Sequence, residues 1–235
     1  MTWALFSADE LTALWLSGKV ALVSTALAVV PGIACAWWLA RGKFRGKLLL
    51  DALIHVPLVA PPTAIGYLLL VVLGRNGWLG RWLYDIFGLE IAFTWRGASV
   101  ASAVMGFPLL VRAARLGIEL VDCRIEDAAR TLGASPLHVL RTVTLPLASP
   151  GILAGVVLCF ARSLGEFGAT ILVAGNVVGE TRTLPLAVYV ATQSPGGEAQ
   201  AVRLVALCFA LAIVALMGSE VLARRAARRL GSQRC

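Results

Sequence analysis

Few side chains in this sequence could do chemistry, and their arrangement does not favour a hydrolytic site. Ser163 is a possible nucleophile, but a serine nucleophile needs a positioned base. The sequence of 235 residues contains only two histidines, His55 and His138, and neither is close to Ser163 along the chain. A phosphate-binding loop of the form G-x-x-x-x-G-K-S/T does not occur either, so we expect any ATP hydrolysis to reside in another chain.

Arg162 and Glu166 form a charged pair within an otherwise apolar segment. Because they are four residues apart, a helix places them on one face. Charges at membrane depth are costly and normally face protein or water. One interpretation is an ion pair that locks this helix to its neighbours. The other is that Arg162 lends positive potential to a path for an anion, with Ser163 beside it and Glu166 holding its orientation.

Three prolines, Pro57, Pro61 and Pro62, interrupt a second apolar segment. Proline removes a backbone donor and breaks the helical hydrogen-bond ladder. Unpaired carbonyls at membrane depth are tolerated where they face protein or a wet cavity. Pro61 and Pro62 are therefore candidates for a path-lining kink, although a static kink that serves packing remains the alternative.

The composition is that of a membrane protein. Hydrophobic residues make up 59% and charged residues 14% of the chain, and the mean hydropathy is +0.83. Soluble domains carry about 25% charged residues. The five cysteines are scattered, without a C-x-x-C pair or a histidine at ligand spacing, so we expect no disulfide, no metal and no cofactor.

Five segments are apolar enough to cross a bilayer, whose core of about 30 Å requires about 20 helical residues. The expected spans cover residues 12–40, 49–73, 92–115, 146–176 and 201–223. A loop at 122–146 and an outer loop at 177–200, with a short interfacial or re-entrant helix, complete a single transmembrane domain, 1–235. Asp9 and Glu10 stand where a signal peptide carries basic residues, so we expect the first span to be retained.

The basic residues predict the orientation, because cytoplasmic loops are enriched in lysine and arginine. On one side, four basic residues follow span one, five lie in the 112–141 region and five lie in the tail. The loops on the opposite side contain five basic residues. The tail residues are Arg224, Arg225, Arg228, Arg229 and Arg234. The N-terminus is therefore expected outside and the C-terminus in the cytoplasm. Lys19 should reach the outer surface, within an aromatic belt of Trp3, Trp15, Trp78, Trp82 and Trp95.

The cytoplasmic loop at 122–146 predicts two short helices. The first, at about 124–132, ends at Gly133, a residue that tolerates positive φ. The second begins with Ser135 as N-cap and Pro136 at the first helical position, and runs to about Thr144. Such a hairpin has no room for its own core. It must pack on another protein or lie on the lipid headgroups.

The loop resembles the EAA-x3-G-x9-I-x-L-P loop of ABC importer permeases. The elements that match are Asp127-Ala128-Ala129, Gly133 and Val143-Thr144-Leu145-Pro146, at the same spacing. Asp127 stands where the pattern has Glu, and Glu126 before it could supply the longer carboxylate. In that family the loop is a coupling helix that docks on a cytoplasmic ATPase subunit. The resemblance gives a coupling role to Glu126, Asp127, Ala128, Ala129, Gly133, Leu145 and Pro146.

The resemblance extends over almost the whole chain to the permeases of molybdate ABC transporters. It is carried by blocks at 53–62, 93–97, 160–169, 179–183 and 193–198. It implies a type I importer permease that works as two copies in the bacterial inner membrane, with two copies of an ATPase subunit and a periplasmic oxyanion-binding protein. The outer-loop residues that would face the binding protein or the anion are Glu180, Thr181, Arg182 and Thr183.

Other interpretations stay open at this stage. Tungstate has nearly the size and charge of molybdate, and no residue distinguishes sulfate, so either could be the transported oxyanion. A secondary transporter or channel that works alone is physically distinct, but it would leave the cytoplasmic hairpin without a partner. The positive charge of +8 is explained by topology and attraction to anionic lipid, so nucleic acid is not expected as a partner.

Overall fold

The computed structural model describes residues 7–231, and the side chains of residues 7–218. All regular elements in this part of the chain are helices, which confirms the all-α prediction. Trp3 and Arg234 lie outside the described residues. The elements are α1 (Ala8–Arg41), α2 (Lys47–Val59), α3 (Pro62–Leu73), α4 (Trp78–Phe87), α5 (Trp95–Glu119), α6 (Cys123–Thr131), α7 (Pro136–Val139), the π-helical turn η1 (Leu140–Thr144), α8 (Leu145–Leu164), α9 (Gly168–Ala174), α10 (Leu184–Gln193) and α11 (Glu198–Gly231).

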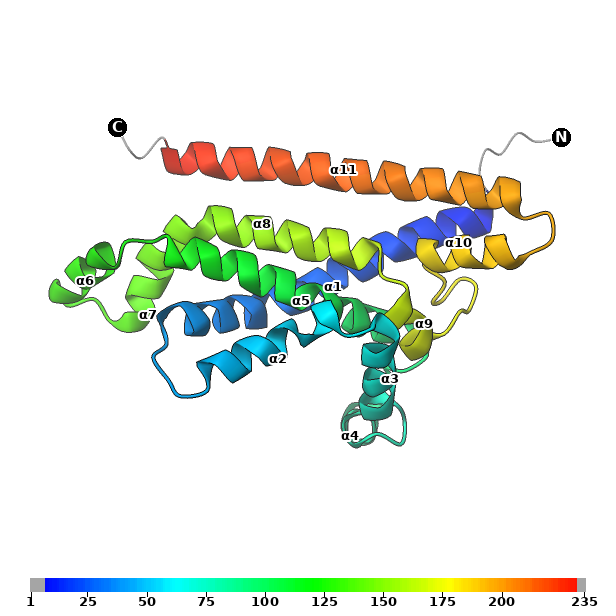
Figure 1. Ribbon diagram of the computed structural model, residues 1–235, viewed down its shortest axis with the longest axis horizontal. Helices are drawn as coiled ribbons and strands as arrows, with labels where there is room; N and C mark the ends of the chain where they lie inside the picture. Colours follow the sequence, from blue (N-terminus) through cyan, green and yellow to red (C-terminus); the bar gives the residue numbers. More distant parts are fainter. Residues whose placement is uncertain (1–6, 232–235) are drawn as a thin grey trace.

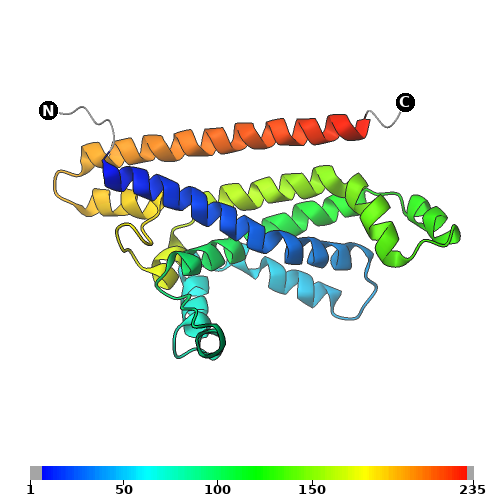
Figure 2. The ribbon, with the colours of Figure 1, turned by 180° about the vertical axis from the view of Figure 1, so that it is seen from behind.

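Helices α1, α5 and α8 lie side by side and form the centre of the molecule (Figures 1 and 2). Small residues allow them to approach closely, as in other membrane helix pairs. A Cβ atom added to Gly151 of α8 would lie 2.6 Å from the Cα of Gly117 in α5, so the two backbones touch there. The buried face of α1 is likewise built from small residues, among them Ala21, Ser24, Ala28, Gly32 and Ala36.

The second predicted span is two helices, α2 and α3, bent by 112° at a short break. Both Ala60 and Pro61 precede a proline, and a residue before proline is pushed to extended backbone angles. Their ψ angles of 145° and 131° are extended, so the helix must end. The described chain thus has four helices long and apolar enough to cross a membrane, and five if the bent pair counts as one span.

The fourth predicted span is not one continuous helix over 146–176. Helix α8 ends at Leu164, and α9 begins at Gly168 after a three-residue break. The Glu166 side chain accepts a hydrogen bond from the Ala169 N–H (2.8 Å). The carboxylate thus pairs one of the backbone N–H groups that have no partner within the first turn of α9.

At its other end α8 is longer than predicted. Pro146 was expected to open the span, yet the helix is continuous from Pro136 to Leu164. The π turn η1 precedes the proline, and within it the Leu145 N–H bonds to the Leu140 carbonyl. This wider turn accommodates a residue that has no N–H of its own.

The remaining helices lie around this centre. The short helix expected in the outer loop is α10, whereas α4 was not predicted, because its ten residues are too few to cross the membrane. Helix α11 runs along one side of the molecule, and a 3.2 Å ion pair between Arg203 and buried Glu10 ties it to α1. The start of α1 and the end of α11 lie at opposite ends (Figure 1), as an odd number of crossings requires.

Candidate functional site

Helices α6 and α7 form a hairpin that projects beyond the ends of α5 and α8 (Figures 1 and 2). Local sequence explains its shape. Asp122 caps α6 by accepting the Arg124 N–H (2.9 Å), Gly133 makes the turn at φ +89°, and Ser135 caps α7 ahead of Pro136. Gly133, Ser135 and Pro136 have the positions that the sequence predicts. Asp122 was not predicted as the N-cap of α6, although aspartate is a residue type that favours this position.

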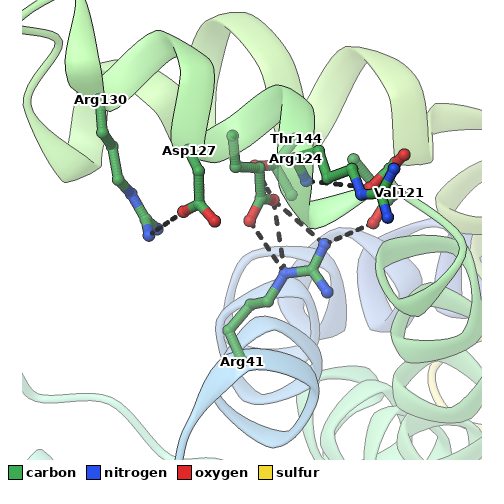
Figure 3. A network of polar contacts seen from close by, with 8 residues as sticks. Arg41, Val121, Arg124, Asp127, Arg130 and Thr144 are labelled. Carbon is green, nitrogen blue, oxygen red and sulfur yellow. Dashed lines mark hydrogen bonds and ion pairs between the residues drawn. The ribbon is translucent and has the colours of Figure 1, made fainter.

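Glu126 fastens this hairpin to two other parts of the chain (Figure 3). Its side chain is 5% exposed, and its Oε2 lies 3.1 Å from Nε of Arg41 at the end of α1. Its Oε1 accepts a 2.7 Å hydrogen bond from the Thr144 hydroxyl of η1. Arg41 also donates to the Val121 carbonyl (2.9 Å). We call Arg41, Glu126 and Thr144 the hairpin anchor.

The carboxylate of Asp127, the next residue, lies beside Arg130 and apart from Arg41 (Figure 3). Its carboxylate is exposed, and its ion pair is with Arg130 one turn later on the same helix (3.2 Å). Ala128 is also exposed. The sequence left open which carboxylate serves the coupling position. The geometry gives Glu126 an internal role and leaves Asp127 available to a partner.

The hairpin carries uncovered apolar side chains along its length. Leu132 is 90% exposed, and Ile125 and Leu137 are each about half exposed. Leu145 and Pro146, by contrast, are half-buried at the base, where η1 continues into α8. The predicted coupling residues therefore fall into an exposed set on the hairpin, an internal anchor, and a base within the long helix.

The breaks in the two interrupted spans lie against each other. A Cβ atom added to Gly168 would lie 2.8 Å from the Cβ of Pro62, and one added to Gly66 would lie 2.8 Å from the Ala169 backbone. The start of α3 thus packs on the start of α9, and Pro61 and Pro62 remain exposed. Two discontinuous helices that meet within a membrane domain are typical of substrate paths in transporters.

Arg162 and Glu166 are the ion pair that their spacing predicts, with Nη1 and Oε2 2.6 Å apart. The Glu166 side chain is buried, whereas that of Arg162 is 29% exposed. Ser163 is buried and donates to the Ser102 carbonyl of α5 (3.4 Å), so its hydroxyl is engaged within the protein. The Arg162–Glu166 pair thus lies at the break before α9, the helix whose start packs on Pro62, and Ser163 faces α5 instead.

The outer-loop residues separate by burial. Thr181 and Thr183 are buried, and the Thr181 hydroxyl accepts the Val177 N–H (2.8 Å), which stabilises the turn. Glu180 is exposed, and Arg182 donates to the side chain of Asn176 (2.8 Å). The two hydroxyls expected to meet an anion or a partner are inside the loop, and Glu180 and Arg182 are the accessible members.

Residues 29–230 match the family described as "binding-protein-dependent transport system inner membrane component". The chain is 54% identical over 222 residues to the Escherichia coli K12 protein "Molybdenum transport system permease protein ModB", covering 94% of this chain and 97% of that protein. It is 52% identical to the Haemophilus influenzae protein of the same name, covering 94% of this chain and 97% of that protein. The Salmonella typhimurium "Sulfate transport system permease protein CysT" is 37% identical, over 89% of this chain and 75% of that one.

The fold has solved counterparts at low sequence identity. A chain in an inward-facing structure of the MetNI methionine ABC transporter superposes with a TM-score of 0.73 at 16% identity, covering 96% of this chain and 99% of that one. A chain in a bacterial ABC transporter that imports the polysaccharide alginate superposes with a TM-score of 0.71 at 16% identity, over 94% and 81% of the two chains. These similarities show the helical arrangement alone.

Proposed function

Because the chain belongs to the family of binding-protein-dependent transport system inner membrane components, we propose that it is the permease subunit that carries molybdate into the cytoplasm. The observation that supports molybdate as the substrate is the 54% identity to a molybdenum permease over nearly the whole of both chains, compared with 37% identity to a sulfate permease. As an ABC importer permease, the chain is a multi-pass inner-membrane protein that works with an ATPase subunit and a substrate-binding protein.

The proposed coupling runs through the hairpin. Leu132, Ile125 and Asp127, which are exposed on the hairpin, would dock in a cleft of the ATPase subunit, which hydrolyses ATP in place of this chain. Closure of two ATPase subunits then moves the hairpin. The hairpin anchor passes this movement to α1 through Arg41 and to α8 through Thr144. In this way the domain would change from inward-facing to outward-facing.

We propose that two copies enclose the path. Helix α2 buries none of its residues within the chain, although it belongs to a predicted span. Its exposed apolar side chains include Leu48, Leu49, Leu53 and Val56. A second copy packed against this surface would place the exposed Pro61–Pro62 break of each copy toward a shared axis. In the orientation that the basic residues predict, the N-terminus lies outside and the hairpin lies in the cytoplasm.

The test is uptake of labelled molybdate by cells that lack this chain, with and without its restoration, in the presence of unlabelled tungstate or sulfate. We expect restored uptake that tungstate blocks and excess sulfate does not. Restored sulfate uptake without molybdate uptake would keep the permease and overturn the substrate. Uptake that persists without the ATPase subunit would instead indicate a transporter that works alone.

Replacement of Arg162 by glutamine is expected to lower uptake about tenfold, the effect of losing about 1.4 kcal/mol of favourable interaction with an anion. Arg162 is partly exposed, so its charge can act beyond Glu166. The double variant Arg162→Gln/Glu166→Gln removes both charges and distinguishes the two interpretations. If the pair only locked the helix, the double variant would regain uptake. We expect it to stay low, at normal protein level.

A further inference from the structure

A cavity of about 410 Å³ lies between α1 and the start of α5. Figure 2 shows that both of these helices begin on the side of the molecule away from the hairpin. Trp15 and Lys19 of α1, Thr94, Trp95 and Arg96 at the start of α5, and Glu180 line it. No step of the proposed transport mechanism uses this cavity.

Two cations converge there on one indole ring. The Lys19 Nζ lies 3.7 Å from the centroid of the Trp95 ring, and the Arg96 Cζ lies 5.7 Å from it. Neither cation forms an ion pair with another described residue. The cavity contains two positive side chains and one carboxylate, that of Glu180, and so has a surplus of one positive charge.

The cavity lies at the level of the lipid headgroups. Lys19 directly precedes the apolar run at 20–40, whose 21 residues match a bilayer core of about 30 Å. Trp15, on the cavity wall, is 73% exposed. Leu11 and Leu22 are exposed on the same face of α1, so apolar surface extends from the cavity along the span. An occupant must therefore satisfy cations at one end and an apolar face at the other.

We infer that this cavity binds the phosphodiester headgroup of an anionic phospholipid, with its acyl chains along the exposed face of α1. One phosphodiester balances the surplus charge. The guanidinium of Arg96 can donate two hydrogen bonds to phosphate oxygens, and Lys19 supplies a point charge. Tryptophan beside them is the residue typical of this membrane level. The placement in the outer leaflet rests on the proposed function, because it requires the hairpin to be cytoplasmic.

The experiment titrates the purified, delipidated transporter complex with phosphatidylglycerol and follows bound lipid by native mass spectrometry. Each of Lys19→Gln and Arg96→Gln is expected to weaken the tightest lipid site about fivefold, from about 1 kcal/mol per basic residue. Arg81→Gln is the matched control. This substitution also removes one positive charge, but Arg81 is 77% exposed on α4 and does not line the cavity. Lys19→Arg keeps the charge and should keep the site.

Equal retention of phosphatidylglycerol by Lys19→Gln, Arg96→Gln and Arg81→Gln would overturn the inference. Equal binding of phosphatidylcholine by the wild-type complex would also do so, because a neutral headgroup leaves the charge surplus unbalanced. Inorganic phosphate that binds as tightly as phosphatidylglycerol would identify a free-anion site instead of a lipid site. These readouts measure binding and not uptake, so a failure of the molybdate assay remains distinguishable from a failure here.

Discussion

Glu126→Gln is expected to release the hairpin and to abolish most coupled uptake. Removing one partner of a buried ion pair costs about 3–5 kcal/mol. The Arg41 side chain is 18% exposed, so water can partly solvate its charge once Glu126 is replaced. We therefore expect a smaller cost of about 2 kcal/mol in the stability of the docked hairpin. That cost raises the open population of the hairpin about thirtyfold. Trypsin, which can cut after Arg124, Arg130 and Arg141, measures this opening as a faster cleavage of the loop in the membrane-inserted complex.

A graded series keeps this prediction specific. Thr144→Val removes only the hydroxyl that donates to Glu126 and should cost about 1 kcal/mol, or about a fivefold faster cleavage. Asp127→Asn changes the adjacent, exposed carboxylate and should leave cleavage almost unchanged, because exposed pairs contribute less than about 1 kcal/mol. If Asp127→Asn opened the loop as much as Glu126→Gln, the assignment of the anchor to Glu126 would be wrong.

Gly133→Val is expected to lower uptake more than about tenfold while the permease remains inserted. Gly133 has φ +89°, and a β-branched residue in this region costs about 1–2 kcal/mol or more. An added Cβ would meet nothing within 4 Å, so the effect comes from the backbone and not from a clash. The turn between α6 and α7 must change to relieve it, and the tip then no longer fits its partner. Molybdate transported per ATP hydrolysed is the measurement.

Gly46→Val is the matched control for the turn. Gly46 has φ +95° and also has nothing within 4 Å of an added Cβ, but it lies in the loop before α2. Its replacement imposes a similar backbone cost outside the hairpin, so the ratio of molybdate to ATP should stay near that of the wild type. A Gly133→Val complex with full coupling would remove the hairpin from the proposed mechanism.

Local chemistry allowed most of the fold to be predicted. Apolar runs located the long helices, and Gly133, Ser135 and Pro136 located the hairpin, because caps and turns depend on neighbouring residues. The consecutive prolines at 61 and 62 predicted a kink in the second span. The sequence did not predict the size of the bend, which follows from two successive residues held in extended geometry.

The candidate site was harder to predict, because its details depend on distant contacts. The choice between Glu126 and Asp127 is made by Arg41, which is 85 residues away along the chain. The break after α8 depends on a Glu166 side chain that turns back onto the following backbone. Thr181 and Thr183 are typical anion ligands by residue type, but tertiary packing buries both.

The uninterrupted helix from Pro136 to Leu164 has a mechanical consequence. Its 29 residues make a rod about 43 Å long, with the hairpin at one end and Arg162 near the other. A tilt of about 5° around one end would displace the opposite end by about 4 Å, about three quarters of the rise of one helical turn. Since the helix continues through the π turn, the two ends cannot move independently. We therefore expect any displacement of the hairpin to move the Glu166 break with it.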